Sequence, residues 1–133
     1  MATGIRADQI LRKYTSFQDI LLDKDLAKLG DAYINLAYSL ALSQRLKRPA
    51  GAKVNNQILA EAVKRTGLRE KLPRRIDRHT RGNAAEALIA YAWLKQTLEL
   101  EDCVRFLREI EDPIEAFTEL LLEISKRLGA VDV

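Results

Sequence analysis

The sequence predicts an all-α fold, and three observations support this prediction. Apolar residues recur at spacings of three and four along most of the 133-residue chain, which is the period of a helix face. No run of alternating or β-branched residues resembles a strand. Capping residues, prolines and glycines separate the periodic stretches. We therefore expect a bundle of helices, built as one domain over residues 1–133.

Four helices are expected in the first half of the chain. Ser16 opens a capping box, Asp25 can cap a long helix, and Asn55 or Asn56 can cap the next one. Gly67 ends that helix, because glycine readily adopts the left-handed terminal conformation. The expected helices cover residues 8–13, 17–22, 26–44 and 56–66. Core candidates on the long helix are Leu29, Leu36, Ala37 and Leu40.

A basic connector and three helices are expected in the second half. Residues 72–82 contain one proline, one glycine and four arginines, and this composition favours an exposed loop. Residues 83–97 form a strongly apolar helix, and two further helices follow over 101–110 and 113–128. Proline in the first turn of the last helix fits this assignment.

The composition, 47% apolar and 31% charged, is typical of a globular protein. No stretch approaches the ~20 apolar residues of a membrane-spanning helix, and the N-terminus lacks the apolar core of a signal peptide. We expect a cytoplasmic protein with no membrane partner. Cys103 is the only cysteine, which excludes an internal disulfide and a cysteine-based zinc site. We expect it to be a small buried side chain.

Basic residues are concentrated in the middle of the chain. Residues 44–81 hold twelve bases and three acids, a net charge of +9, whereas residues 96–133 hold ten acids and four bases, a net charge of −6. This asymmetry favours a nucleic-acid partner, and the alternative is a solvated surface rich in ions. The side chains expected to contact phosphate are Arg74, Arg75, Arg78 and Arg81, followed by Lys47, Arg48 and Lys53.

Two apolar helices each contain a single carboxylate. Asp31 is the only charged residue in positions 29–42, and Glu86 is the only one in positions 82–94. A carboxylate among core residues needs a partner, because its desolvation is costly. Both acids stand near the expected start of their helices, so interaction with the helix dipole is one explanation. Alternatively, the two carboxylates form a site for Mg²⁺, or Mn²⁺, that activates water against a phosphodiester.

Three segments resemble motifs of the ribonuclease III family, in the same order and at similar separations. Residues 26–33 resemble the signature in which a Leu-Gly-Asp-Ala core opens the central helix and its aspartate binds metal. Residues 54–60, followed by 66–68, resemble the segment in which a Ser-Asn pair opens the next helix. Residues 82–90 resemble the second acidic motif, which carries a Glu-Ala-Leu-Ile-Gly stretch. The resemblance covers roughly residues 25–106.

This resemblance implies a fold and an activity. The fold is the helical bundle of the ribonuclease III endonuclease domain, without a separate domain for binding double-stranded RNA. The activity is Mg²⁺-dependent hydrolysis of phosphodiesters in double-stranded or structured RNA, leaving a 5′-phosphate and a 3′-hydroxyl, with Asp31 and Glu86 as metal ligands. The family also implies a two-fold homodimer whose signature helices pack together and whose basic valley recognises A-form RNA by shape.

Two positions depart from the family signature. Where the usual signature has further acids, this chain has Ala27 and Asn83. The chain is similar in this respect to the Mini-III branch of the family, which keeps the central aspartate and glutamate and lacks both other acids. The resemblance to that branch implies that activity can survive the loss. Asn83 is then expected to orient a water or a ligand in the catalytic site.

Two other functions compete with the endoribonuclease. A catalytically silent relative would bind structured RNA through the arginines, and the substitutions at Ala27 and Asn83 motivate this alternative. A helical scaffold would dock proteins through its acidic C-terminal helices. The apolar row that motivates the scaffold, which we expect to be chiefly core, is Phe117, Leu120, Leu121 and Ile124.

The single histidine and the aromatic residues are not expected to be catalytic. His79 lies among arginines, where a phosphate contact or simple exposure is a better interpretation than a general base. Core or dimer packing is expected, rather than base stacking, for Tyr33, Tyr38, Tyr91 and Trp93.

Overall fold

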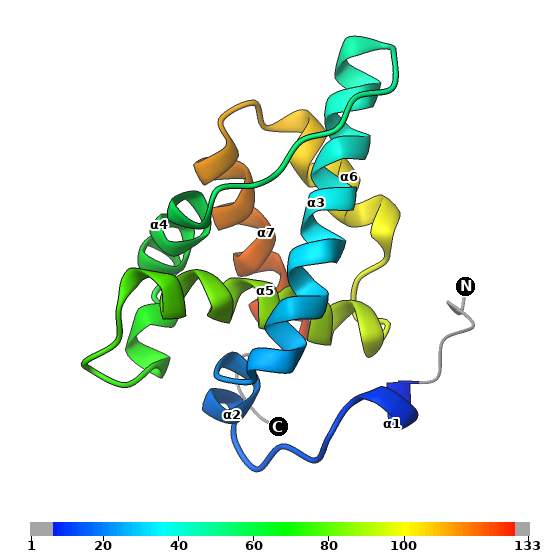
Figure 1. The fold of residues 1–133 in the computed structure, drawn as a ribbon. Coiled ribbons are helices and arrows are strands. Elements are labelled where there is room, and N and C mark those ends of the chain that lie inside the picture. Colours follow the sequence, from blue (N-terminus) through cyan, green and yellow to red (C-terminus); the bar gives the residue numbers. More distant parts are fainter. Residues whose placement is uncertain (1–6, 130–133) are drawn as a thin grey trace.

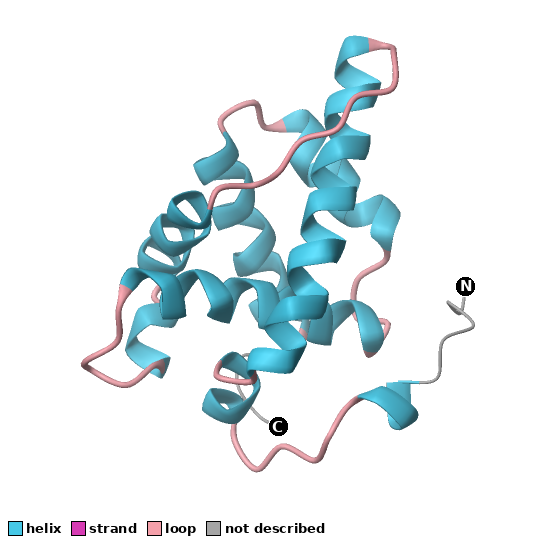
Figure 2. Ribbon diagram, in the orientation of Figure 1, coloured by secondary structure: helices cyan, strands magenta, loops and turns pink. Residues whose placement is uncertain are grey.

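The computed structural model describes residues 7–129 and shows helices and no strand in this range, which confirms the all-α prediction (Figures 1 and 2). The elements are α1 (Ala7–Ile10), α2 (Phe17–Leu21), α3 (Lys24–Leu46), α4 (Asn56–Thr66), the 3₁₀ helix η1 (Leu68–Lys71), α5 (Arg78–Leu94), α6 (Leu100–Glu109) and α7 (Pro113–Arg127). Among these described elements, no helix is both long enough and apolar enough to cross a membrane.

Helix α5 lies at the centre of the bundle. It packs most extensively against α3 and α4 and also contacts α2 and α7, while α6 packs against α3 and α7 (Figure 1). Every residue from Ala84 to Ala90 is buried, including Glu86. The helix is apolar around most of its circumference because neighbours cover it on several sides. Any polar side chain on α5 is therefore fixed by the helices around it.

Three of the expected helix ends are confirmed, and one cap is wrong. The Ser16 hydroxyl accepts from the Asp19 amide at 3.1 Å, Asn55 caps α4, and Gly67 ends α4 at φ +83°. Asp23, not Asp25, caps α3: its carboxylate accepts from the amides of Asp25 and Leu26 at 3.0 and 3.2 Å. The same carboxylate accepts from the Tyr14 hydroxyl at 2.7 Å, a long-range contact that sequence spacing does not reveal.

The expected loop over residues 72–82 is partly wrong. Asp77 caps α5 by accepting from the Thr80 amide at 2.8 Å, and the helix therefore begins at Arg78. Arg78 and Arg81 are helical, and only residues 72–77 form the connector. The first turns of α5 carry exposed basic residues, so the apolar pattern on which the boundary was based does not reach them. The short helix η1 was also missed.

The expected core face of α3 is wrong at two leucines. Leu36 is 52% exposed and Leu40 38%, whereas Ala37 is buried and Leu29 is half-buried. Helix α3 packs on α5 and α6 through a neighbouring stripe that includes Tyr33, Ile34 and Ala41. The exposed leucines lie on another side of the helix, and Leu40 borders a shallow apolar groove lined in part by Leu100 and Val104 of α6.

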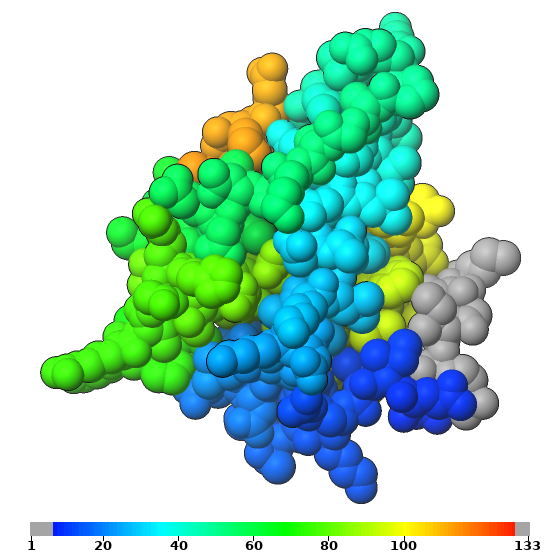
Figure 3. All heavy atoms as spheres, in the orientation of Figure 1, coloured from blue at the N-terminus to red at the C-terminus, as the bar shows by residue number. Residues whose placement is uncertain are grey.

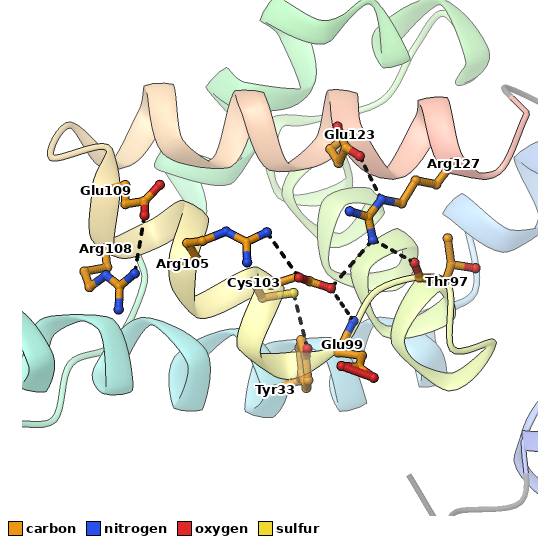
Figure 4. Close-up of polar contacts among 10 residues, drawn as sticks. Tyr33, Thr97, Glu99, Cys103, Arg105, Arg108, Glu109, Glu123 and Arg127 are labelled. Carbon is orange, nitrogen blue, oxygen red and sulfur yellow. Dashed lines mark hydrogen bonds and ion pairs between the residues drawn. The ribbon is translucent and has the colours of Figure 1, made fainter. Parts of the chain in front are cut away.

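The acidic C-terminal third is held together by its own ion pairs. Arg127 of α7 binds Glu123 at 2.7 Å, contacts Asp102 of α6 at 3.6 Å and donates to the Thr97 carbonyl at 3.1 Å (Figure 4). Cys103 is buried, as expected, and accepts a hydrogen bond from the Tyr33 hydroxyl at 3.3 Å.

The apolar row on α7 is core, as expected. Its four residues are at most 1% exposed: Phe117, Leu120, Leu121 and Ile124. These side chains therefore offer no docking face, and the observation that motivated a protein-binding scaffold is removed.

The aromatic residues pack against one another, as expected. The rings of Tyr33 and Trp93 lie 4.9 Å apart, those of Tyr38 and Phe117 6.3 Å apart, and those of Tyr14 and Tyr91 5.8 Å apart. Tyr33 joins α3 to α5, and its hydroxyl reaches α6, so a single side chain ties three helices together.

Candidate functional site

Helices α3 and α5 approach each other most closely at Gly30. A Cβ atom on Gly30 would collide with the backbone of Glu86, including its carbonyl oxygen. Only glycine permits this approach, because its lack of a side chain lets one backbone rest against another. Asp31 follows Gly30 directly, so the helix crossing brings the Asp31 and Glu86 side chains together.

The two carboxyl groups interact across the crossing. Glu86 is only 7% exposed, whereas the Asp31 side chain is 44% exposed and opens to the surface. Burial, hydrogen bonding to Asp31 and the negative charge of Asp31 raise the pKa of Glu86 to about 8, and the Lys53 ammonium partly opposes this shift. The uncharged form of Glu86 is favoured mainly because burial removes its carboxyl group from water, and the hydrogen bond and charge of Asp31 add to this effect. A second cation in this place would stabilise the ionised pair.

Both carboxylates lie well inside their helices. Helix α3 begins at Lys24 and α5 at Arg78, so Asp31 and Glu86 each stand in the third helical turn. The helix dipole acts mainly within the first turn. The dipole explanation of these acids is therefore wrong, and their partners are each other and Lys53.

A cleft of about 930 Å³ opens in front of the carboxylate pair. Four residues expected to be functional line it: Asp31, Lys53, Asn83 and Glu86. The cleft is also lined by residues that sequence analysis had not assigned to the site, including Lys24, Lys28, Asn55, Asn56, Asp77 and His79. His79, Asn83 and Glu86 are spaced by four and three residues on α5, so they share one face of the helix.

The amino ends of α4 and α5 meet beside this cleft. A Cβ atom on Gly82 would collide with the side-chain amide of Asn56, so the first turn of α4 rests directly on α5. Asn55, which caps α4, lines the same cleft.

Ala27 and Asn83 occupy positions in the same cleft. These are the positions at which the resemblance places two further acids. The buried methyl group of Ala27 offers no ligand atom, whereas the Asn83 amide offers an uncharged oxygen and a donor. Of the four acids that the resemblance implies, the site therefore keeps two, Asp31 and Glu86.

The other basic residues expected to bind phosphate lie outside the cleft. Arg74 and Arg75 are exposed on the connector, which projects at the left edge of Figure 3. The Arg69 guanidinium stabilises this turn by donating hydrogen bonds to the carbonyls of Pro73 and Arg74. Arg78 and Arg81 follow on the first turn of α5, where Arg81 is half-buried and donates to the Ile76 carbonyl at 3.3 Å.

Lys47 and Arg48 do not lie near the carboxylate pair. They stand at the carboxyl end of α3, about 24 Å along the helix axis from Asp31 at a rise of about 1.5 Å per residue. Of the second group of expected phosphate ligands, the structure therefore brings only Lys53 to the cleft.

The side chains of the cleft suit a hard divalent cation. Among residues 7–129 no group of three or more histidine, cysteine, aspartate or glutamate side chains is arranged to hold a metal ion. Mg²⁺ does not require such a cage, because it commonly binds through one or two carboxylates and keeps several waters. Asp31 and Glu86, which contact each other in the cleft, meet this requirement.

Comparison with protein-family models matches the Ribonuclease III model to residues 24–131. The chain belongs to the ribonuclease III family. The matched range starts at the first residue of α3 and includes both carboxylates and the whole basic segment. A comparison with curated proteins finds no match. The ribonuclease III fold is thus confirmed from the beginning of α3, and α1 and α2 precede the matched range.

Proposed function

We propose that this ribonuclease III-family protein is a Mg²⁺-dependent endoribonuclease that cleaves double-stranded or structured RNA. The observation that carries the proposal is the contact between Asp31 and Glu86 at the mouth of an open cleft. Two carboxylates from different helices, brought together at a glycine crossing, form a pair that would hold a metal. Family membership supports RNA as the substrate.

Each polar residue of the cleft has a separate role in this proposal. Asp31 and Glu86 hold Mg²⁺, which when bound supplies the positive charge that activates water and stabilises a phosphodiester under attack. Asn83 stands one turn before Glu86 on the same face of α5, and its amide orients a water or a substrate oxygen. Glu86 is only 7% exposed, and the side chains packed around it restrict its movement.

The basic residues around the cleft bind the RNA backbone. Lys53 lines the cleft itself, and Arg74, Arg75 and Arg78 extend the positive surface along the connector and the start of α5. Planar guanidinium groups suit bidentate phosphate contacts, and A-form RNA is recognised mainly through phosphates, 2′-hydroxyls and shape. Arg81 stabilises the connector by donating to the Ile76 carbonyl. Lys47 and Arg48 form a separate basic patch at the carboxyl end of α3.

We also propose that two copies of the chain form a homodimer through α3. Leu36 and Leu40 expose large apolar side chains one turn apart, and Leu40 continues into the groove against α6. A second copy placed on a two-fold axis would cover this surface with the same surface. Such a dimer would contain two clefts, one from each copy.

A catalytically silent RNA-binding protein is the second candidate. Its support is specific: Ala27 lines the cleft without offering a ligand atom, and Asn83 carries no charge. Binding of RNA would survive these substitutions, because Arg74, Arg75 and Arg78 lie outside the cleft. Cleavage therefore has to be measured apart from binding.

The deciding experiment is cleavage of a labelled RNA duplex with Mg²⁺, with EDTA, and with the Glu86→Gln and Asp31→Asn variants. We expect cleavage by the parent protein with Mg²⁺ and its loss in the other three samples. Glu61→Gln is the matched control, since it removes an exposed carboxylate of α4 that lies outside the cleft. Duplex binding without cleavage at any Mg²⁺ or Mn²⁺ concentration would favour the silent relative instead.

A further inference from the structure

One face of α3 carries four polar side chains at intervals of one turn. These residues are Asp31, Asn35, Ser39 and Ser43, each four positions after the last. Residues at this spacing lie above one another on a helix surface. The acid of the functional site is thus the first member of a polar stripe that runs toward the carboxyl end of α3.

The stripe binds the extended segment that returns from α3 to α4. Ser43 Oγ accepts from the Ala50 amide at 2.9 Å, Ser39 Oγ accepts from the Ala52 amide at 2.9 Å, and Asn35 Oδ1 accepts from the Val54 amide at 2.8 Å. Ser39 also donates to the Ala52 carbonyl at 3.1 Å. Figure 3 shows this segment lying along α3. The segment runs antiparallel to the helix, with every second residue anchored.

This pairing fixes the position of Lys53. Its neighbours Ala52 and Val54 are both bound to α3, so its backbone cannot slide along the helix. The next step of the stripe after Asn35 is Asp31, and Lys53 Nζ lies 3.7 Å from Asp31 Oδ2. The ammonium therefore reaches the carboxylate pair from a backbone that the helix holds in register.

We propose that Lys53 is the resident counter-ion of the Asp31–Glu86 pair, and that a divalent cation must displace its ammonium from Asp31 in order to bind. This inference rests on the proposed metal-binding role of the two carboxylates. The lysine side chain is 78% exposed, so it can leave Asp31 without disturbing the core. The ion pair consequently lowers the affinity for a divalent cation below the affinity that the two carboxylates would have without Lys53.

The positive charge of Lys53 opposes the negative charge of the Asp31–Glu86 pair, and the site therefore accommodates a lysine beside its acids. With Ala27 and Asn83 in the cleft, Asp31 and Glu86 are the two acids kept at the positions where the resemblance implies metal ligands, and Asp31 already has a partner. A bound divalent cation places two positive charges where the ammonium places one. Displacement of the Lys53 ammonium would therefore require a sufficient concentration of the divalent cation.

The test is calorimetric titration of Mn²⁺ into the full chain, without RNA, for the parent protein and Lys53→Met. We expect Lys53→Met to bind Mn²⁺ several-fold more tightly. Lys53→Arg, which keeps the positive charge, should bind like the parent. Lys28→Met is the matched control, because Lys28 lines the same cleft while the ion pair with Asp31 comes from Lys53.

The outcomes separate this inference from the proposed nuclease activity. Unchanged or weaker Mn²⁺ binding in Lys53→Met, or an equal gain in Lys28→Met, would overturn the counter-ion role. Tighter binding in Lys53→Met would support it even if the parent protein cleaves no RNA, since the titration contains neither substrate nor turnover. Equal urea midpoints for Lys53→Met and the parent would show that the folded state is intact.

Discussion

Gly30 of α3 rests against the backbone of Glu86 in α5, and this contact sets the separation of the two carboxyl groups. The polar site is therefore built on main-chain packing rather than on a flexible loop. Because Asp31 is the next residue after Gly30, any outward movement of α3 at this point would also separate Asp31 from Glu86. Stability and metal binding should then change together.

The first prediction concerns Gly30→Ala. Alanine has the higher helix propensity, by about 1 kcal/mol, and should stabilise an isolated helix. Here its methyl group collides with the Glu86 backbone, which cannot yield as a side chain could. We expect a net loss of about 1–3 kcal/mol in the free energy of unfolding, measured by urea denaturation, together with weaker Mn²⁺ binding.

Gly51→Ala is the matched control for this substitution. A Cβ atom on Gly51 meets nothing within 4 Å, and the residue is exposed. Its free energy of unfolding should stay within about 0.5 kcal/mol of the parent value. If Gly30→Ala is as stable as Gly51→Ala, the close crossing of α3 and α5 is not a constraint on the fold.

The second prediction concerns Glu86→Gln in the absence of metal. In the unfolded chain Glu86 titrates at its ordinary pKa of 4.5, whereas in the folded protein the pKa is about 8. Between these values the folded state holds the additional proton, so this residue makes stability fall as pH rises from 4.5 to about 8. Glutamine removes that loss because it has no proton to give up.

The expected result is a variant whose advantage grows with pH. Glu86→Gln should gain on the parent by on the order of 1 kcal/mol per pH unit inside this window, as measured by urea denaturation at several pH values. Glu61→Gln, which changes an exposed carboxylate, should show no such trend. Parallel pH profiles for the parent and Glu86→Gln would mean that Glu86 is ionised throughout.

The sequence was sufficient to identify the two central carboxylates, and a specific feature explains why. Asp31 is the only charged residue in positions 29–42 and Glu86 the only one in positions 82–94, so the need for a partner could be expected from composition alone. The start of α5 was not identified, because Asp77 caps a first turn of exposed bases that carries no apolar period. Because of the same error, Glu86 was placed closer to the start of its helix than it is.

The contact between Lys53 and Asp31 could not be derived from the sequence. It depends on the register of the segment anchored by Asn35 and Ser39, and short polar side chains on a helix give no sign of which backbone groups they bind. The prediction that Leu36 and Leu40 belong to the core was wrong for another reason. Apolar periodicity does not distinguish a face covered by the protein's own core from one that stays exposed.

The third prediction concerns Leu36→Asp. If α3 forms the homodimer surface, a carboxylate at this 52% exposed position would be buried opposite its own copy and would repel it. We expect the protein to become monomeric in analytical ultracentrifugation and to remain folded by circular dichroism, since Leu36 is not in the core. Leu122→Asp, on an exposed position of α7, should leave the oligomeric state unchanged. A monomeric parent protein would refute the dimer proposal directly.

The fourth prediction concerns the projecting arginines and is made in the Glu86→Gln background, so that RNA binding is measured without cleavage. Arg74 and Arg75 are both exposed on the connector, just before the start of α5. A protein that neutralises RNA phosphates releases counterions in proportion to the number of phosphate contacts. Replacing both by alanine should weaken binding of an RNA duplex and reduce the slope of log affinity against log salt concentration by about 1–2. Fluorescence anisotropy at several KCl concentrations gives both quantities.

The control is Lys126→Ala, which removes an exposed basic residue at the end of α7. It should change neither the affinity nor the salt slope, because Lys126 lies in the acidic third of the chain. An unchanged salt slope in the double variant would place the RNA on another surface, with the lysines of the cleft as the next residues to replace.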